Sequence, residues 1–142
     1  MSLETIKTLV DELTTLHVTR GVQPSELVEN MFEDAYVEST ARKTSQSMVF
    51  DITFLESDEE GQSSKITMRY PYDRDRYLTL VEQKISARKF SIQWDRALAV
   101  QERIEKLGTL LAVKLPQDEV ASILSTMPKD YVELFPQLRL VA

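Results

Sequence analysis

The stretch "MVFDITFLESDEEGQSSKITMRYPY", residues 48–72, introduces a two-residue hydrophobic period into the chain. Its first part alternates large apolar side chains with Val49, Asp51 and Thr53; the apolar ones are Met48, Phe50, Ile52 and Phe54. A polar turn around Gly61 follows, and Ile66, Met68 and Tyr70 then resume the alternation. Such a period is typical of strands that are covered on one side. The stretch therefore predicts an antiparallel β-hairpin.

Helical periods precede this hairpin. Ser2 is placed to cap a first helix with one apolar face, formed by Leu3, Ile6, Leu9, Val10, Leu13 and Leu16. Gly21 suits the left-handed residue that ends such a helix. Pro24 and Ser25 open a second helix. Its apolar stripe is Leu27, Val28, Met31, Phe32, Ala35 and Tyr36.

The pattern after the hairpin is mixed. Residues 76–86 fit either a short helix or a strand, and we favour the helix. "KFSIQW", residues 89–94, alternates again and predicts a third strand. Asp95 is placed to cap a long helix whose stripe is Ala97, Val100, Ile104, Leu107 and Leu111. Pro116 and Pro128 each introduce a short terminal helix.

These elements predict an α+β fold with the helices segregated from the sheet. It contains two N-terminal helices, a small antiparallel sheet of about three strands, a long helix and two short C-terminal helices. The 142 residues are the size of one ordinary domain. We therefore expect a single domain over residues 1–142, in which 115–142 could form a C-terminal helical extension.

Composition restricts the class of protein. No apolar run approaches the roughly 20 residues that cross a bilayer, and the acidic N-terminus "MSLETIKTLVDEL" does not resemble a secretory signal. The chain has no cysteine, which excludes disulfides, thiol catalysis and thiolate metal ligands. We expect a cytoplasmic protein that makes no membrane contact.

Catalytic groups are sparse in the sequence. The sequence has one histidine, His17. It is predicted near the C-terminal end of the first helix, where the negative end of the helix dipole would favour it in an ordinary structural role. The acidic run from Glu56 to Glu60 lacks the spacing of a calcium loop and reads as a solvated turn. The three glycines are too scattered to cradle a phosphate. We expect no enzyme, no metal and no cofactor, and an enzyme that uses carboxylates alone is the least favoured alternative.

Charge is distributed unevenly along the chain, whose net charge is -6. Residues 1–64 carry a net charge of -9, whereas residues 65–106 carry +4. Residues 69–90 combine six basic side chains with four aromatic ones. This stretch could be a solvated sheet face, a docking surface for a protein or, less favoured, a nucleic-acid surface. The candidate partner-binding residues are Arg69, Tyr72, Arg74, Arg76, Tyr77, Arg88 and Lys89.

A large part of the chain also resembles a known family. The resemblance covers residues 6–107 and rests on a helix, a break at Arg20-Gly21-Val22, a second helix, a basic end and a β-hairpin. Its matching positions in the second helix and basic end are Glu26, Val28, Glu33, Ala35, Arg42 and Lys43. In this order the chain is similar to the N-terminal domain of the bacterial transcription elongation factor NusA. The resemblance implies a module that docks on RNA polymerase; it carries over no functional residue.

Together these observations favour a non-catalytic, regulatory protein–protein interaction module. The alternative is a nucleic-acid-associated regulator that uses residues 69–90. The glutamates of the second helix, Glu26, Glu29, Glu33 and Glu38, could instead imitate a phosphate backbone, although such rows usually serve solubility. The C-terminal apolar residues Phe135, Leu138 and Leu140 could form a homodimer interface.

Overall fold

The computed structural model describes residues 3–128 and 131, and its chain divides into two compact units. One unit combines residues 1–19 with 97–142, and the other is continuous from 20 to 96. Each unit has its own cluster of buried apolar side chains. The α+β class is confirmed, and the expectation of a single domain stays a prediction.

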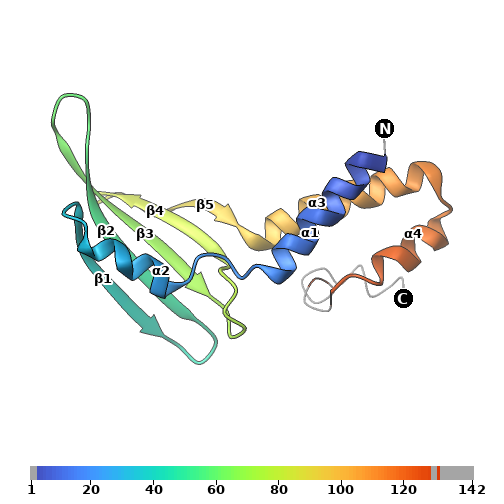
Figure 1. Ribbon diagram of the computed structural model, residues 1–142, viewed down its shortest axis with the longest axis horizontal. Coiled ribbons are helices and arrows are strands. Elements are labelled where there is room, and N and C mark those ends of the chain that lie inside the picture. The colour runs from blue at the N-terminus through green and yellow to red at the C-terminus, as the bar shows by residue number, and fades with distance from the viewer. Residues whose placement is uncertain (1–2, 129–130, 132–142) are drawn as a thin grey trace. The chain divides into compact units, whose positions relative to one another are not determined.

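The continuous unit is built on a five-stranded antiparallel sheet (Figure 1). The strands are β1 Tyr36–Lys43, β2 Met48–Ser57, β3 Ser63–Tyr72, β4 Leu80–Ile85 and β5 Ser91–Asp95. They pair in sequence order, so every neighbour is joined by a short connection. The predicted hairpin is confirmed as β2 and β3, which pair over their full length from Met48 opposite Tyr72 to Ser57 opposite Ser63. The predicted count of about three strands is too low.

One face of this sheet is covered and the other is polar. The two-residue period of β2 and β3 places Phe50, Ile52 and Tyr72 on the covered face, where they are buried with Leu27. Leu27 comes from helix α2, Pro24–Val28, which continues as the 3-10 turn η1, Glu29–Phe32, across that face (Figure 1). Side chains therefore reach solvent from the polar face of the sheet and from the turns at the two ends of its strands.

Two predicted helical segments are strands in the structure. The second helix was expected to reach Tyr36, but η1 ends at Phe32 and Tyr36 begins β1. Backbone pairing with β2 outweighs the helical stripe there. The favoured helix over residues 76–86 is also wrong, because this segment forms a loop and then β4, which pairs with β3 and β5.

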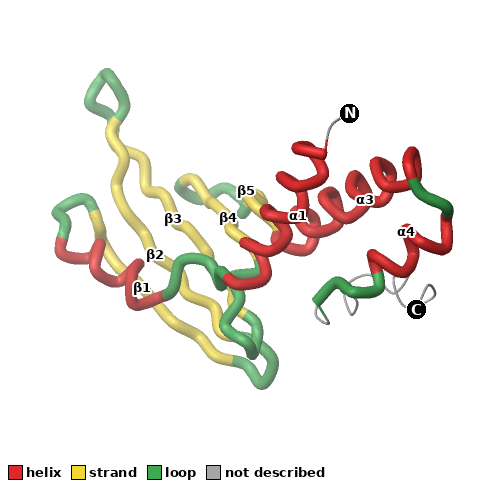
Figure 2. The backbone as a smooth tube through the Cα atoms, turned by 45° about the vertical axis from the view of Figure 1, so that its right-hand side comes forward, coloured by secondary structure: helices red, strands yellow, loops and turns green. Residues whose placement is uncertain are grey.

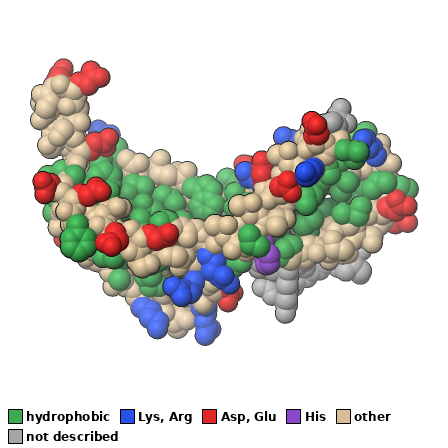
Figure 3. Space-filling view, in the orientation of Figure 1, with side chains coloured by type: hydrophobic (Ala, Val, Ile, Leu, Met, Phe, Trp, Pro, Cys, Tyr) green, Lys and Arg blue, Asp and Glu red, His purple; other side chains and the backbone are tan. Residues whose placement is uncertain are grey.

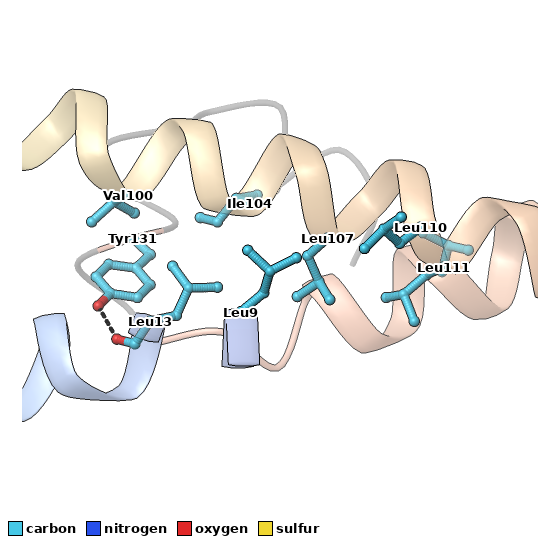
Figure 4. Packing of buried hydrophobic residues seen from close by; sticks show 9 residues of the cluster. Leu9, Leu13, Val100, Ile104, Leu107, Leu110, Leu111 and Tyr131 are labelled. Carbon is cyan, nitrogen blue, oxygen red and sulfur yellow. Dashed lines mark hydrogen bonds between the residues drawn. The ribbon is translucent and has the colours of Figure 1, made fainter. Parts of the chain in front are cut away.

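The discontinuous unit is helical. It contains α1 Leu3–Val18, nearly all of α3 Arg96–Lys114, and α4 Gln117–Leu124. Figure 4 shows Leu9 and Leu13 of α1 facing Val100, Ile104 and Leu107 of α3, as their predicted stripes require. Arg103 joins the two helices through an ion pair with Glu12 at 2.8 Å.

The last predicted helix, after Pro128, lies outside the described residues except for Tyr131. That ring is fully buried, and its hydroxyl donates a hydrogen bond to the carbonyl oxygen of Leu13 (Figure 4). Phe135, Leu138 and Leu140, where a dimer interface was expected, are outside the described residues. No helix in the described ranges has both the length and the apolar character needed to span a bilayer.

Candidate interaction surface

The two ends of the sheet separate the basic residues that the sequence groups together. Arg74 and Arg76 lie in the β3–β4 connection, whereas Arg88 and Lys89 lie in the β4–β5 connection. These connections are at opposite ends of β4, a six-residue strand about 20 Å long at roughly 3.3 Å per residue (Figure 2). Residues 69–90 therefore do not form one continuous basic surface.

Two predicted contact residues are buried. Tyr72 is 3% exposed and donates its hydroxyl to the carbonyl oxygen of Val22 at 2.6 Å. Burial raises the pKa of Tyr72 well above its ordinary value. Tyr77 is 8% exposed, and the guanidinium of Arg96 lies 4.2 Å from its ring centroid. Both rings are packed in the core of the unit, so the prediction that they contact a partner is wrong.

Arg69 lies on the polar face in the middle of the sheet. Two of its nitrogens donate to the two carboxylate oxygens of Asp51, at 2.9 and 3.0 Å. That hydrogen bonding raises the pKa of Arg69. Its guanidinium also stacks 4.0 Å from the ring centroid of Phe90, and Arg42 approaches the same Asp51 at 3.5 Å. The charge of Arg69 is thus largely compensated within the sheet.

A groove of about 500 Å³ opens at the end of the sheet that carries Arg74. We call it the basic groove. The β1–β2 turn forms one wall and the start of the β3–β4 connection forms the other. Its lining residues are Lys43, Thr44, Ser45, Ser47, Met48, Asp73 and Arg74.

Side-chain hydrogen bonds fix both walls of the basic groove. In the β1–β2 turn, the Thr44 hydroxyl accepts the backbone N–H groups of Gln46 and Ser47 at 3.2 and 3.0 Å. In the β3–β4 connection, one carboxylate oxygen of Asp73 accepts the backbone N–H groups of Asp75 and Tyr77 at 2.9 and 3.0 Å. Such local bonds hold polar turns in one conformation. The groove is therefore a formed feature of the fold.

The electrostatics of the basic groove differ from those around Arg69. Lys43 and Arg74 are both exposed, and within residues 3–128 and 131 neither forms an ion pair. Asp73 also lines the groove, so the lining carries two positive charges and one negative charge. One oxygen of this carboxylate accepts the two turn N–H groups. Figure 3 shows Lys and Arg side chains gathered at this end of the sheet. The arrangement can attract an anionic group and offer it hydroxyl donors.

Sequence reasoning found Arg74 and missed Lys43 and the three hydroxyl residues of the opposite wall. The available signal was the run Arg42-Lys43-Thr44-Ser45-Gln46-Ser47, in which two basic residues enter a cluster of turn-forming residues. Its proximity to Arg74 follows from the register of β2 with β3, which places Met48 opposite Tyr72. That register becomes visible only when the strands are paired.

The groups considered for catalysis, His17 and the acidic β2–β3 turn, make local contacts. His17 packs edge to face against Tyr131, with ring centroids 6.0 Å apart. In the acidic β2–β3 turn, Asp58 accepts the backbone N–H groups of Glu60 and Gln62, each at 2.9 Å. Among the described residues, no group of three or more His, Asp or Glu side chains could hold a metal ion.

No protein-family model, curated protein or solved structure matches this chain. The resemblance to the N-terminal domain of NusA therefore stays a prediction.

Proposed function

We propose that this chain is a non-catalytic protein-binding module that holds an acidic segment of a partner protein in the basic groove. The observation that carries the proposal is the pair Lys43 and Arg74, two exposed cations without an ion pair in the described residues, on walls fixed by local hydrogen bonds. Glutamate or aspartate side chains of a partner would supply the missing counter-charges. The hydroxyl group of Ser45 would donate a further hydrogen bond to them.

The same features favour a protein over a nucleic acid. Phosphate-driven affinity grows with the number of cations that contact the backbone, and the groove is lined by only two. The chain as a whole has a net charge of -6, which repels a long, densely charged polyanion more than a short acidic segment. Met48 in the groove gives apolar contact to a peptide, and the volume of about 500 Å³ lies within the range of ordinary ligand sites.

A binding experiment with a defined probe tests the proposal. The probe is a short fluorescein-labelled peptide of glutamate and serine, followed by fluorescence anisotropy at physiological salt. We expect wild type to bind it and the double variant Lys43→Glu/Arg74→Glu to bind about 10- to 100-fold more weakly. Each reversal replaces an attraction by a repulsion, at roughly 1 kcal/mol or less per exposed pair.

The matched control reverses two exposed charges at the other end of the sheet. Arg88→Glu/Lys89→Glu changes the net charge of the protein by the same amount and leaves the groove intact. Equal losses in both double variants would show that affinity follows net charge alone, independent of the groove, and would contradict the proposal. Tighter binding of a single-stranded DNA of matched net charge, with affinity falling steeply as salt rises, would favour the nucleic-acid alternative.

The transcriptional and regulatory part of the proposal rests only on the resemblance of residues 6–107. This resemblance implies that bacterial RNA polymerase is the protein that carries the acidic segment. Purified core polymerase in place of the peptide tests this step. Binding that Lys43→Glu/Arg74→Glu weakens would support it, whereas no binding by wild type would overturn it and leave the peptide result standing.

A further inference from the structure

Strand β1 is an edge of the sheet. It has eight residues, Tyr36–Lys43, and within the described part of the chain it pairs with β2 alone. Most of its side chains are exposed, and it contains no proline. In Figure 1 α2 and η1 lie over the face of the sheet, and no other described helix runs along the outer side of β1. An open edge of this length is a template for another strand.

The alternation of the ladder identifies the backbone groups on this open edge. Thr44 donates its N–H to the carbonyl oxygen of Ser47, which closes the β1–β2 turn. Because hydrogen-bonded and non-bonded pairs alternate in an antiparallel ladder, even-numbered residues of β1 bond to β2. The odd-numbered residues Ser39, Ala41 and Lys43 therefore direct their N–H and C=O groups outward.

The charges along β1 run from acidic to basic. Glu38 stands near its start and Arg42 near its end, and both are exposed on the polar face of the sheet. Thr40 lies midway between them. If a second β1 runs antiparallel with Thr40 opposite Thr40, Glu38 of each copy faces Arg42 of the other. The same register places Ser39 opposite Ala41, so outward backbone groups meet as a hydrogen-bonded pair.

We propose that two copies of this chain form a symmetric dimer through antiparallel pairing of their β1 strands. The result is a continuous sheet across the two-fold axis, with the Glu38–Arg42 pair made twice. A two-fold contact requires a surface complementary to itself, and the charge order of β1 meets that requirement. An unrelated extended peptide could pair with the same edge. The charge order of β1, however, is complementary to itself, and this favours a second copy of the chain. Association through one strand edge buries little surface, so we expect a Kd in the micromolar range.

Sedimentation equilibrium of the full chain, at concentrations up to about 100 µM, measures the dimer directly. Ala41→Pro is the first variant, because it removes an N–H that points outward and leaves the ladder to β2 intact. We expect wild type to dimerise and Ala41→Pro to remain monomeric at the same concentrations. A monomeric wild type overturns the proposal, and so does a dimer that Ala41→Pro leaves unchanged.

Charge reversal keeps the test valid if the proline variant fails to fold. In Glu38→Lys, two lysines face two arginines across the axis, and in Arg42→Glu, two glutamates face two others. Each variant alone should dimerise about tenfold more weakly than wild type, since two pairs at up to roughly 1 kcal/mol change sign. In a heterodimer of the two variants, the introduced lysine faces the introduced glutamate, and the native Glu38 faces the native Arg42. An equimolar mixture should therefore form heterodimers with the wild-type Kd.

The mixture separates the second copy from other occupants of the edge. Restoration requires that residue 38 of one copy lies opposite residue 42 of another, in this register. Variants that weaken association singly but do not recover on mixing would show a dimer in another arrangement and overturn the proposal. Circular dichroism of every variant checks that the sheet is retained.

Discussion

Gly21 lies in the segment between α1 and α2 with a φ of +87°, a conformation that side chains with a Cβ adopt at a cost. A Cβ built there would be 2.8 Å from the Cβ of Leu78, which is closer than such atoms come in folded proteins. Leu78 has little freedom to withdraw, because its N–H donates to the carbonyl oxygen of Arg20 at 2.8 Å. The sequence indicated a left-handed glycine at this position, and the structure adds a steric requirement.

We therefore predict that Gly21→Ala lowers the free energy of unfolding by about 2–4 kcal/mol, which combines backbone strain with overpacking. Gly61→Ala is the matched control. Gly61 has a similar φ of +83°, but nothing lies within 4 Å of its added Cβ. It should lose only the backbone part, about 1–2 kcal/mol. Urea unfolding followed by tryptophan fluorescence measures both, and equal losses would contradict a role for the Leu78 contact.

Helix α3 contains the third glycine, Gly108, where we expect alanine to stabilise the protein. Gly108 lies in mid-helix, and a Cβ would meet only the Cδ1 of Leu124 at 3.6 Å, an ordinary contact distance. Alanine costs less backbone entropy than glycine in a helix. Gly108→Ala should raise the free energy of unfolding by about 0.5–1 kcal/mol, measured by urea titration of the helical signal at 222 nm. Gly108→Val should gain less, since a branched side chain presses on Leu124. A loss of stability in Gly108→Ala would contradict the 3.6 Å spacing between the added Cβ and Leu124.

Among the elements, the sequence correctly predicts the helices and strands that the hydrophobic period of a single segment is enough to identify. The stripe of α3 and the alternation of β2 and β3 each bury a face that is visible in a single segment. Strands β1 and β4 were missed for a different reason. Glu38, Ser39 and Thr40 show no apolar alternation, and Leu80-Val81 are consecutive apolar residues that suit either element. Both strands are fixed by backbone pairing with the neighbouring strands, which the pattern of a single segment does not contain.

At the scale of the whole molecule, the candidate site depends on how remote segments meet. Arg74 was predicted from a local cluster of charge and aromatic residues. Lys43 is its neighbour across the basic groove because the β1–β2 and β3–β4 turns lie at the same end of the sheet. Tyr72 and Tyr77 show the reverse error, since residues with polar tips were read as surface groups while the sheet buries them. The sequence indicated that basic residues form the site, and the topology of the sheet decides which basic residues share a surface.

The topology also predicts how the molecule unfolds. Residues 20–96 are continuous in sequence and contain all five strands, α2, η1 and the buried cluster around Phe50 and Ile52. The helical unit, in contrast, needs two segments that this stretch separates. We predict that a fragment of residues 20–96 folds by itself, with a β-type circular dichroism spectrum and a cooperative urea transition. This size is marginal but sufficient for a core of this kind.

The fragment of residues 20–96 with the substitution Ile52→Asp is the control for that experiment. Ile52 is 2% exposed, and a carboxylate at that position would be buried without a counter-charge. The variant should be unfolded in water, which shows that the wild-type fragment owes its transition to the cluster around Phe50 and Ile52. A cooperative wild-type fragment would replace the expected single domain by two folding units. An unfolded wild-type fragment would instead show that residues 20–96 need the helical segments, and would support one domain over residues 1–142.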